Sequence, residues 1–456
     1  MGWTQMDKCC DSRKASEDLE ILHQVFDRLF PICRSITGVG LRQSLDILGE
    51  HMPIVRHSVP TGENVFDWTI PEEWLIRSAT LVGPDGKTYA DFGKSNLSVI
   101  NYSAPVNAVM PLDILQKHLH SLPDLPTAIP YVTSYYQRNW GFCLSHESRE
   151  AMPQGDYHAA IDSEFVDGVL DYGDSILPGE TKDEVLVSSY LCHPSLANNE
   201  LSGPLVLMLL HGRIAKWPRR RLTYRFVLAP ETIGSIAYLS RHGDELRERA
   251  VAGLVLTCLG GPSGRLRYKT SRRENALVDR VVATLAEMEQ IDIQPFSPIG
   301  GSDERQYCSP GFNLPIGQVC RNVYGEYDGY HNSLDTKEFM GIEALVRSVD
   351  SIERILRNLE IAGRFENLSP FGEPQLGRRG LYPNVNSAKN WLLSSDTHMD
   401  GRQFLNCMLM ILNYSDGSTD MLDIAKRCNV DLEMLIPVIE KLESQKLLRY
   451  RAGVVG

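Results

Sequence analysis

The sequence lacks the features that mark membrane, secreted and nucleic-acid-binding proteins. Its apolar runs are shorter than the roughly 18–20 residues that a membrane-spanning helix needs. The N-terminal stretch has no apolar segment, which predicts that no secretory signal is present. Positive charge is also scarce: 46 Lys and Arg stand against 58 Asp and Glu, so the net charge is −12. We therefore expect neither a membrane nor a nucleic acid as the main partner.

Cysteine is too sparse to build a disulfide framework, because only 10 are spread over 456 residues. No two of them have the spacing of two to four residues that is typical of a structural zinc finger. We expect small buried thiols in a reducing compartment, which indicates a cytoplasmic protein. The composition, 43% hydrophobic and 23% charged, is that of an ordinary globular chain. At roughly 150 residues per domain, the length predicts two or three domains.

Apolar strands alternate with amphipathic helices beyond residue 183. The predicted strands are Glu184–Leu191, Leu222–Ala229, Gly253–Leu259 and Pro315–Cys320, and the predicted helices are Leu201–Ile214, Ile233–Leu246, Glu274–Met288 and Lys337–Leu359. This alternation predicts an α/β domain with a mostly parallel central sheet. Ligands bind beyond the carboxyl ends of the strands in such sheets, so functional residues should directly follow the strands.

Two other regions have a different pattern. Residues 65–160 combine short strands, Pro/Gly turns and aromatic clusters, which predicts a β-rich domain inserted into an α/β domain of residues 15–64 and 161–375. After a Pro/Gly-rich linker, residues 385–456 read as three short helices and a ribbon, the pattern of a winged helix-turn-helix. Its predicted recognition helix, from Asp431, is acidic, and Gly401–Gly456 has no net charge. We therefore expect this module to pack against other protein surface or to pair with a second copy in a homo-oligomer, rather than to read DNA.

Candidate catalytic residues follow the first two predicted strands. His193 comes after the first strand, and Asn199 and Glu200 stand where the next helix begins. Imidazole nitrogens and carboxylate oxygens are the usual protein ligands of zinc, although a single strand-end histidine is also a common structural residue. Glu231 follows the second strand and could hold a metal or act as a general base. It could also simply stand at the N-terminus of the next helix, where the helix dipole stabilises a negative charge.

Two later motifs complete the set. Asp303 lies in a Gly-Ser-Asp-Glu turn, and Tyr330-His331 precede the last long helix, which Asp335 could cap. Two histidines and several acids thus fall at successive ends of one predicted sheet. A hydrolytic metal site requires this convergence, since its ligands must meet while one position stays open.

These motifs resemble the zinc aminopeptidase and glutaminyl cyclase clan, and more closely a bacterial aminopeptidase-like family with an inserted β-domain and a C-terminal winged helix. The matching segments are Arg34-Ser35-Ile36-Thr37-Gly38, Trp140 to Ser145, Cys192-His193-Pro194-Ser195, Pro230 to Gly234, Gly301 to Glu304 and Tyr330 to Ser333. The resemblance implies an α/β/α sandwich with a mostly parallel sheet and a hydrolase that uses zinc. His193 and His331 match metal-binding histidines of the clan, and Glu231 matches its general base.

The same comparison shows three departures. The position of the bridging aspartate is Asn199, the second glutamate of the Glu-Glu pair is Thr232, and the later aspartate falls near Thr257. Too few carboxylates remain for a pair of ions, so the pattern favours one zinc ion over two. The ligands predicted for it are His193, Glu200, Asp303 and His331.

The resulting hypothesis is a metal-dependent hydrolase that cleaves an amide bond in a small molecule or a short peptide. Glu231 would act as the general base on metal-bound water, and Arg34, Asn199 and Tyr330 would contact the substrate. For Arg34 the alternative is equally open that its motif only caps the following helix. One alternative is a metal-free binding or scaffold protein, suggested by the three neutral replacements. Others are a zinc-dependent cyclising or acyl-transfer enzyme and, least supported by charge, a DNA-binding regulator.

Overall fold

The structure of this protein is a computed structural model that describes residues 12–323, 325–382 and 399–453. The N-terminal stretch for which no secretory signal is predicted, and Pro383 at the end of the predicted linker, lie outside these ranges. Within them, no helix combines the length and the apolar character needed to cross a bilayer. The eight cysteines that the structure describes are all free thiols.

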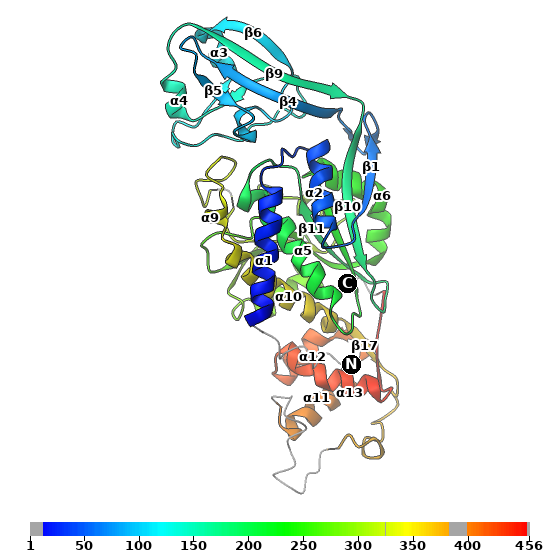
Figure 1. Cartoon of the computed structure of the whole chain (residues 1–456). Helices are drawn as coiled ribbons and strands as arrows, with labels where there is room; N and C mark the ends of the chain where they lie inside the picture. The colour runs from blue at the N-terminus through cyan, green and yellow to red at the C-terminus, as the bar shows by residue number, and fades with distance from the viewer. Residues whose placement is uncertain (1–11, 324, 383–398, 454–456) are drawn as a thin grey trace.

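An eight-stranded sheet forms the centre of the molecule, in the order β1-β10-β12-β11-β13-β16-β14-β15 (Figure 1). Its four middle strands run parallel and are β12 (Thr223–Ala229), β11 (Glu184–Tyr190), β13 (Ala250–Leu256) and β16 (Ile316–Cys320). The outer strands are β1 (Val55–Pro60), β10 (Val169–Leu177), β14 (Leu266–Lys269) and β15 (Ile291–Gln294). The predicted α/β class is confirmed, and the middle strands all end at one edge of the sheet.

Helices cover both faces of this sheet, which explains why its middle strands are apolar throughout. On β11, Val185 and Val187 belong to one buried cluster, whereas Leu186 points into the other. The first cluster lies under α1 (Ser12–Leu29), α2 (Val39–Gly49), α5 (Ser202–Ala215), α7 (Leu277–Leu285) and α10 (Ile342–Ala362). The second lies under α6 (Ile233–Arg249) and α8 (Glu304–Tyr307).

The predicted helix Lys337–Leu359 is in fact two helices, so that prediction was wrong. A short α9 (Lys337–Met340) is separated from α10 by Gly341, whose φ of 64° is incompatible with a continuous α-helix. Thr336 caps α9 by accepting a hydrogen bond from the backbone N–H of Phe339. The predicted cap Asp335 is instead buried against another segment.

A second, antiparallel sheet stands above the central one, at the top of Figure 1. Its strand order is β5-β4-β9-β6, with β4 (Glu73–Val82), β5 (Thr88–Asp91), β6 (Val106–Pro111) and β9 (Asp156–Val166). Smaller elements accompany it: β2 (Asn64–Val65), β3 (Trp68–Thr69), η2 (Asn96–Ser98), α3 (Leu112–Leu115), η3 (Gln116–His118), β7 (Leu119–His120), β8 (Phe142–Cys143) and α4 (His146–Glu150). The sheet has an apolar core of its own.

One loop of this upper region reaches the edge of the central sheet. The backbone N–H of Tyr131 donates to the carbonyl of His331 at 2.8 Å, and Ser333 donates in turn to the carbonyl of Ile129 at 2.9 Å. The upper region thereby supplies side chains to the place where the predicted catalytic residues lie.

The C-terminal region folds as the predicted winged helix. Its helices are α11 (Gly401–Tyr414), α12 (Met421–Cys428), η6 (Leu432–Leu435) and α13 (Ile436–Ser444), and its strands are β18 (Asp416–Asp420) and β19 (Leu448–Tyr450). The strand β17 (Arg364–Asn367), which directly follows α10, lies between β18 and β19. The wing is therefore built around a strand that continues from the α/β domain.

Two acidic residues of the predicted recognition segment, Glu433 and Glu443, face the α/β domain. Glu443 accepts from Arg219 at 2.6 Å and from Arg221 at 3.0 Å, and Glu433 lies 2.8 Å from Arg354 of α10. Arg221 is fully buried and also stacks over the ring of Phe365 at 4.8 Å. These contacts explain why this helix is acidic: its charges complement arginines of the neighbouring domain.

We expect Arg221→Met to lower the free energy of unfolding by about 3 kcal/mol, since a buried hydrogen bond to a charged partner contributes about 1.5–3 kcal/mol. Urea denaturation followed by circular dichroism measures the change. Arg77→Met, which removes an exposed arginine paired with Asp162, is the control and should have little effect. Equal losses in the two variants would show that the domain contact does not depend on Arg221.

Candidate active site

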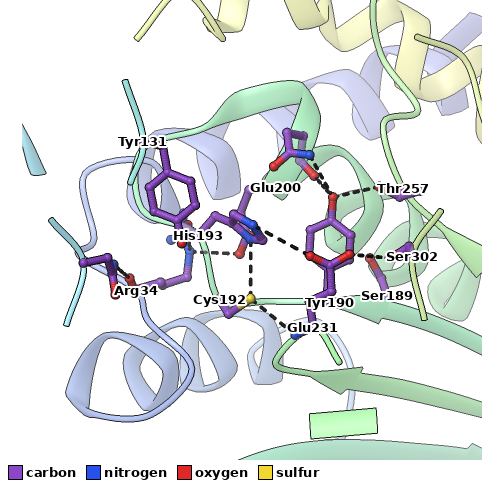
Figure 2. Close-up of polar contacts among 12 residues, drawn as sticks. Arg34, Tyr131, Ser189, Tyr190, Cys192, His193, Glu200, Glu231, Thr257 and Ser302 are labelled. Carbon is purple, nitrogen blue, oxygen red and sulfur yellow. Dashed lines mark hydrogen bonds and ion pairs between the residues drawn. The ribbon is translucent and has the colours of Figure 1, made fainter. Parts of the chain in front are cut away.

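His193 lies at the centre of the candidate site, three residues after the end of β11. Its ring is 5% exposed, and its two nitrogens face different carboxylates (Figure 2). Nδ1 lies 2.9 Å from Oε2 of Glu200, and Nε2 lies 3.8 Å from Oε2 of Glu231. The imidazole therefore stands between a fully buried acid and a partly open one.

Glu200 is held by a buried ion pair with Arg34. A single π-helical turn, η4 (Ala197–Leu201), places the carboxylate of Glu200 beneath the imidazole of His193, and such turns are common at functional sites. Arg34 Nε lies 3.3 Å from Oε1 of Glu200, and both side chains have no exposed surface. The guanidinium also donates to the carbonyls of Leu29 and His193, at 2.6 and 3.0 Å.

Arg34 is thus placed to hold the His193 loop, and its side chain has no exposed surface through which it could contact a substrate carboxylate in this structure. A bound ligand cannot reach a guanidinium that is enclosed by protein on every side. The sequence motif around Arg34 did mark a residue of the site, but one whose partners lie inside the protein.

Glu231 follows β12 and is the more accessible of the two acids, with 27% of its side chain exposed. The hydroxyl of Ser302 donates to its Oε1 at 3.0 Å. Burial raises the pKa of Glu231 above its usual value, and the neighbouring His193 opposes this shift. A carboxylate with a raised pKa at an open edge of a sheet has the properties of a general base.

The turn after Glu231 is strained. Thr232 has a φ of 64°, which is rare for a β-branched residue, and such strain is concentrated at functional sites. Asp303 stabilises the turn, because its Oδ1 accepts from the N–H of Thr232 at 2.8 Å and from the hydroxyl of Ser235 at 2.9 Å. Burial and the charge of Glu231 raise the pKa of Asp303 to about 8. The structure therefore places Asp303 behind Glu231, with one oxygen already engaged.

His331 lies beside His193, with 5.3 Å between the ring centroids. Its backbone also has a positive φ, 57°, and its ring stacks on that of Tyr330 at 4.2 Å. Burial and the proximity of His193 lower the pKa of His331 to about 3, so the ring is neutral at neutral pH. A neutral imidazole is the form that binds a metal ion.

Asn199 occupies a fixed and buried position in η4. Its backbone N–H donates to Asp335 at 2.8 Å, and its Nδ2 donates to the hydroxyl of Tyr190 at 3.2 Å. Its side-chain oxygen Oδ1 is buried and has no hydrogen-bond partner. Thr257 also bonds the hydroxyl of Tyr190, at 2.8 Å. Neutral groups therefore fill two of the positions where the resemblance implies carboxylates.

Two groups of side chains among the described residues could hold a metal ion. One consists of Cys192, His193 and Glu200, all buried, and the other of His57, Asp174 and His242. Burial raises the pKa of the Cys192 thiol to about 11, so the thiol is protonated at neutral pH. Sequence reasoning did not identify Cys192 as a candidate ligand, although the residue stands next to His193 in the motif.

Tyr131 is a further residue that sequence reasoning missed. Its ring lies 5.0 Å from that of His193 and 5.5 Å from that of His331, measured between centroids. It belongs to the upper region, which the sequence pattern treats as a separate domain. One of the aromatic clusters noted within residues 65–160 was the available signal: it contains Tyr135, whose hydroxyl bonds that of Tyr131 at 2.5 Å.

A cavity of about 430 Å³ lies elsewhere, between α7, α10 and the winged helix. Two ion pairs lie in its lining, between Arg280 and Asp423 and between Arg354 and Glu433. None of the candidate active-site residues lines this cavity.

The comparison with protein families covers nearly the whole chain. The family model described as "Domain of unknown function (DUF4910)" matches residues 23–362, and a winged helix-turn-helix model matches residues 363–450. The chain belongs to the DUF4910 family. A relative from Clostridium acetobutylicum, provisionally named a polysaccharide biosynthesis protein with an aminopeptidase-like domain, is 38% identical over 442 residues, 96% of this chain and 98% of the relative.

Two solved structures resemble this chain in fold. A crystal structure from Clostridium acetobutylicum, provisionally described as a peptidase, has 37% identity and a TM-score of 0.83 over 96% of this chain and 98% of its own. The zinc aminopeptidase BSAP from Bacillus subtilis has 15% identity and a TM-score of 0.56 over 75% of this chain and 94% of its own. The predicted resemblance in fold to zinc aminopeptidases is thereby confirmed for this DUF4910 protein.

We expect Arg34→Met to lower the free energy of unfolding by about 3–5 kcal/mol, because it leaves the buried Glu200 carboxylate without its cation. The double variant Arg34→Met/Glu200→Gln should lose less than the sum of the two single variants, since neither charge is then left unpaired. Urea denaturation of all three variants measures this coupling. Strictly additive losses in the double variant would contradict the ion pair. The control is Arg28→Met, because Arg28 forms an exposed pair with Glu50.

Proposed function

We propose that this protein is a metal-dependent hydrolase that cleaves an amide bond in a small molecule or a short peptide, with Glu231 as the general base. The observation that carries this proposal is the position of Glu231: its carboxylate lies 3.8 Å from Nε2 of His193 and is partly open to solvent. The aminopeptidase-like fold and relatives support a hydrolase-type role.

One metal ion is proposed on the open side of His193. The Nδ1 side of His193 is taken by Glu200, so Nε2 faces the open side together with Glu231. A histidine that ligates a metal through one nitrogen usually has the other nitrogen bonded to a carboxylate, as here. His331 lies alongside, and the unpartnered Oδ1 of Asn199 is a further oxygen donor.

We assign the metal to the Nε2 side of His193, with His193 and His331 as its nitrogen ligands. Glu200 then acts as the acid that orients His193, and Asp303 as the acid that supports the Glu231 turn, rather than as the ligands named in the sequence hypothesis. The closely packed group of Cys192, His193 and Glu200 is buried, which leaves no open position for a substrate. Asn199, Thr232 and Thr257 disfavour a second ion.

The proposed chemistry divides between the ion and the side chains. A zinc ion bound at this site would act as a Lewis acid toward the amide carbonyl. Glu231 takes a proton from the attacking water and returns it to the leaving nitrogen. The Ser302 hydroxyl fixes one oxygen of Glu231, so the other faces His193 and the substrate. Asn199 and Tyr330 remain the residues proposed to contact the substrate.

We expect Glu231→Gln to lower turnover by about 10²–10⁴-fold, because glutamine keeps the shape of the side chain but cannot take a proton. Glu231→Gln should contain as much zinc as the wild-type chain, whereas His193→Ala and His331→Ala should each contain one zinc ion fewer. The measurements are elemental analysis and turnover of aminoacyl amides, short peptides and N-acetylated amino sugars. The last class is included because the Clostridium acetobutylicum relative is named for polysaccharide biosynthesis.

The exposed Glu150→Gln is the matched control and should change neither quantity. Undiminished turnover of Glu231→Gln would end the proposed mechanism. A wild-type chain free of zinc and inactive on every substrate would instead favour a binding or scaffold protein. Product analysis separates hydrolysis from the remaining alternative, cyclisation or acyl transfer.

The winged helix is proposed to have a structural role or to pair in a homo-oligomer, not to bind nucleic acid. Two of its acidic residues, Glu433 and Glu443, are engaged by arginines of the α/β domain. A helix that presents carboxylates to its own neighbouring domain is poorly suited to approach phosphates.

A further inference from the structure

A second group of potential metal ligands lies beside the middle of α6, away from Glu231, which precedes the start of this helix. His57 comes from the edge strand β1, Asp174 from its neighbour β10 and His242 from α6. One donor atom of each lies within 4.8 Å of the other two. Three separate elements therefore bring two imidazoles and one carboxylate to a single point.

The closest distance in this group is compatible with a shared metal ion. His57 Nε2 lies 3.1 Å from Oδ1 of Asp174. Two ligands at about 2.0–2.1 Å from one tetrahedral ion are about 3.3 Å apart, so this pair needs a shift of only a few tenths of an ångström. The donor atoms of the whole group lie within 4.8 Å of one another and would draw closer around an ion. The rings of His57 and His242 are 5.5 Å apart between centroids and edge-on to one another.

The surroundings hold these side chains in place. The ring of His57 stacks on Tyr172 at 5.1 Å, and the ring of His242 stacks on Tyr238 at 4.5 Å. The hydroxyl of Tyr172 lies 3.3 Å from Nε2 of His242. Asp174 is 7% exposed, whereas 33% of the His57 side chain is open to solvent. An ion could therefore enter from the His57 side, between side chains that the neighbouring aromatic rings already hold close together.

The local charge also favours a cation. Arg225 approaches the other oxygen of Asp174 at 3.7 Å, but it is bonded more closely to Glu184 at 2.7 Å and to Glu245 at 2.9 Å. Arg249 bonds the same two glutamates. Three carboxylates thus face two guanidiniums, and one negative charge is left without a matching positive charge.

We propose that His57, Asp174 and His242 form a peripheral site for a divalent transition metal, best suited to Zn²⁺. Two imidazoles and one carboxylate are a common zinc ligand set that leaves a position for water. An ion at this site links the edge of the central sheet to α6. Since α6 begins directly after Glu231 and Thr232, the ion stabilises the helix that carries the strained turn, without touching the candidate active site.

The test is a zinc titration of the metal-stripped full-length chain by calorimetry, with the melting temperature recorded in parallel. His193→Ala removes the candidate active-site ion, and this variant should still bind about one Zn²⁺ and melt at a higher temperature when zinc is present. Adding His57→Ala to it should weaken the remaining zinc binding by at least about 10-fold. The partly exposed His57 can be replaced without opening the core.

The exposed His23→Ala, also made in the His193→Ala background, is the matched control and should leave the binding unchanged. Absorption of the Co²⁺-loaded variant should lack thiolate charge-transfer bands, because the site contains no cysteine. Zinc binding that is equal with and without His57, or absent from His193→Ala, would overturn the proposal. Either result leaves the active-site proposal standing, since that proposal depends on the zinc that His193→Ala loses.

Discussion

The candidate site depends on one buried ion pair, between Arg34 and Glu200. Both side chains are fully enclosed, so each charge would be costly without the other. Together they neutralise one another and present Oε2 of Glu200 to Nδ1 of His193 at 2.9 Å. The orientation of the imidazole follows from this pair, and with it the exposure of Nε2 toward Glu231. Arg34 comes from the N-terminal part of the chain, so the pair also fastens the helix α1 and its following loop to the edge of the sheet.

The residues at this edge of the central sheet differ from those of the zinc site that the resemblance implies. Asn199 and Thr257 are tied together through the hydroxyl of Tyr190, in a small neutral network. Thr232, at the position of a lost glutamate, is strained and is held by Asp303. Neutral groups stand where the resemblance implies charged ones, which is the reason that we propose a single ion, on the Nε2 side of His193.

Much of the fold could be predicted from the sequence, because the main strands are buried on both faces and therefore read as continuous apolar runs. Glu184–Tyr190 and Thr223–Ala229 lie within one or two residues of their predicted bounds. The winged helix was equally visible, since its helices carry clear amphipathic patterns. The break at Gly341 was missed because the pattern continues across it, and only the backbone angle of that glycine interrupts the helix.

The site was harder to predict, for a physical reason. Strand ends point to the edge where functional residues gather, which is why His193 and Glu231 could be named. The sequence does not show which side of an imidazole faces which carboxylate, nor that Arg34 is buried rather than open to a substrate. Distant segments of the chain must lie side by side to place Tyr131 in the site and to bring His57, Asp174 and His242 together. No local sequence pattern shows which distant segments do so.

The most direct test of this account is the location of zinc in crystals of the full-length chain, found from anomalous scattering at the zinc absorption edge. If Glu200 and Arg34 orient His193 as the structure indicates, a single peak in the candidate site should lie beside Nε2 of His193, on the side of Glu231. A peak between His193 and Glu200, or two adjacent peaks as in a paired-ion enzyme, would contradict the account.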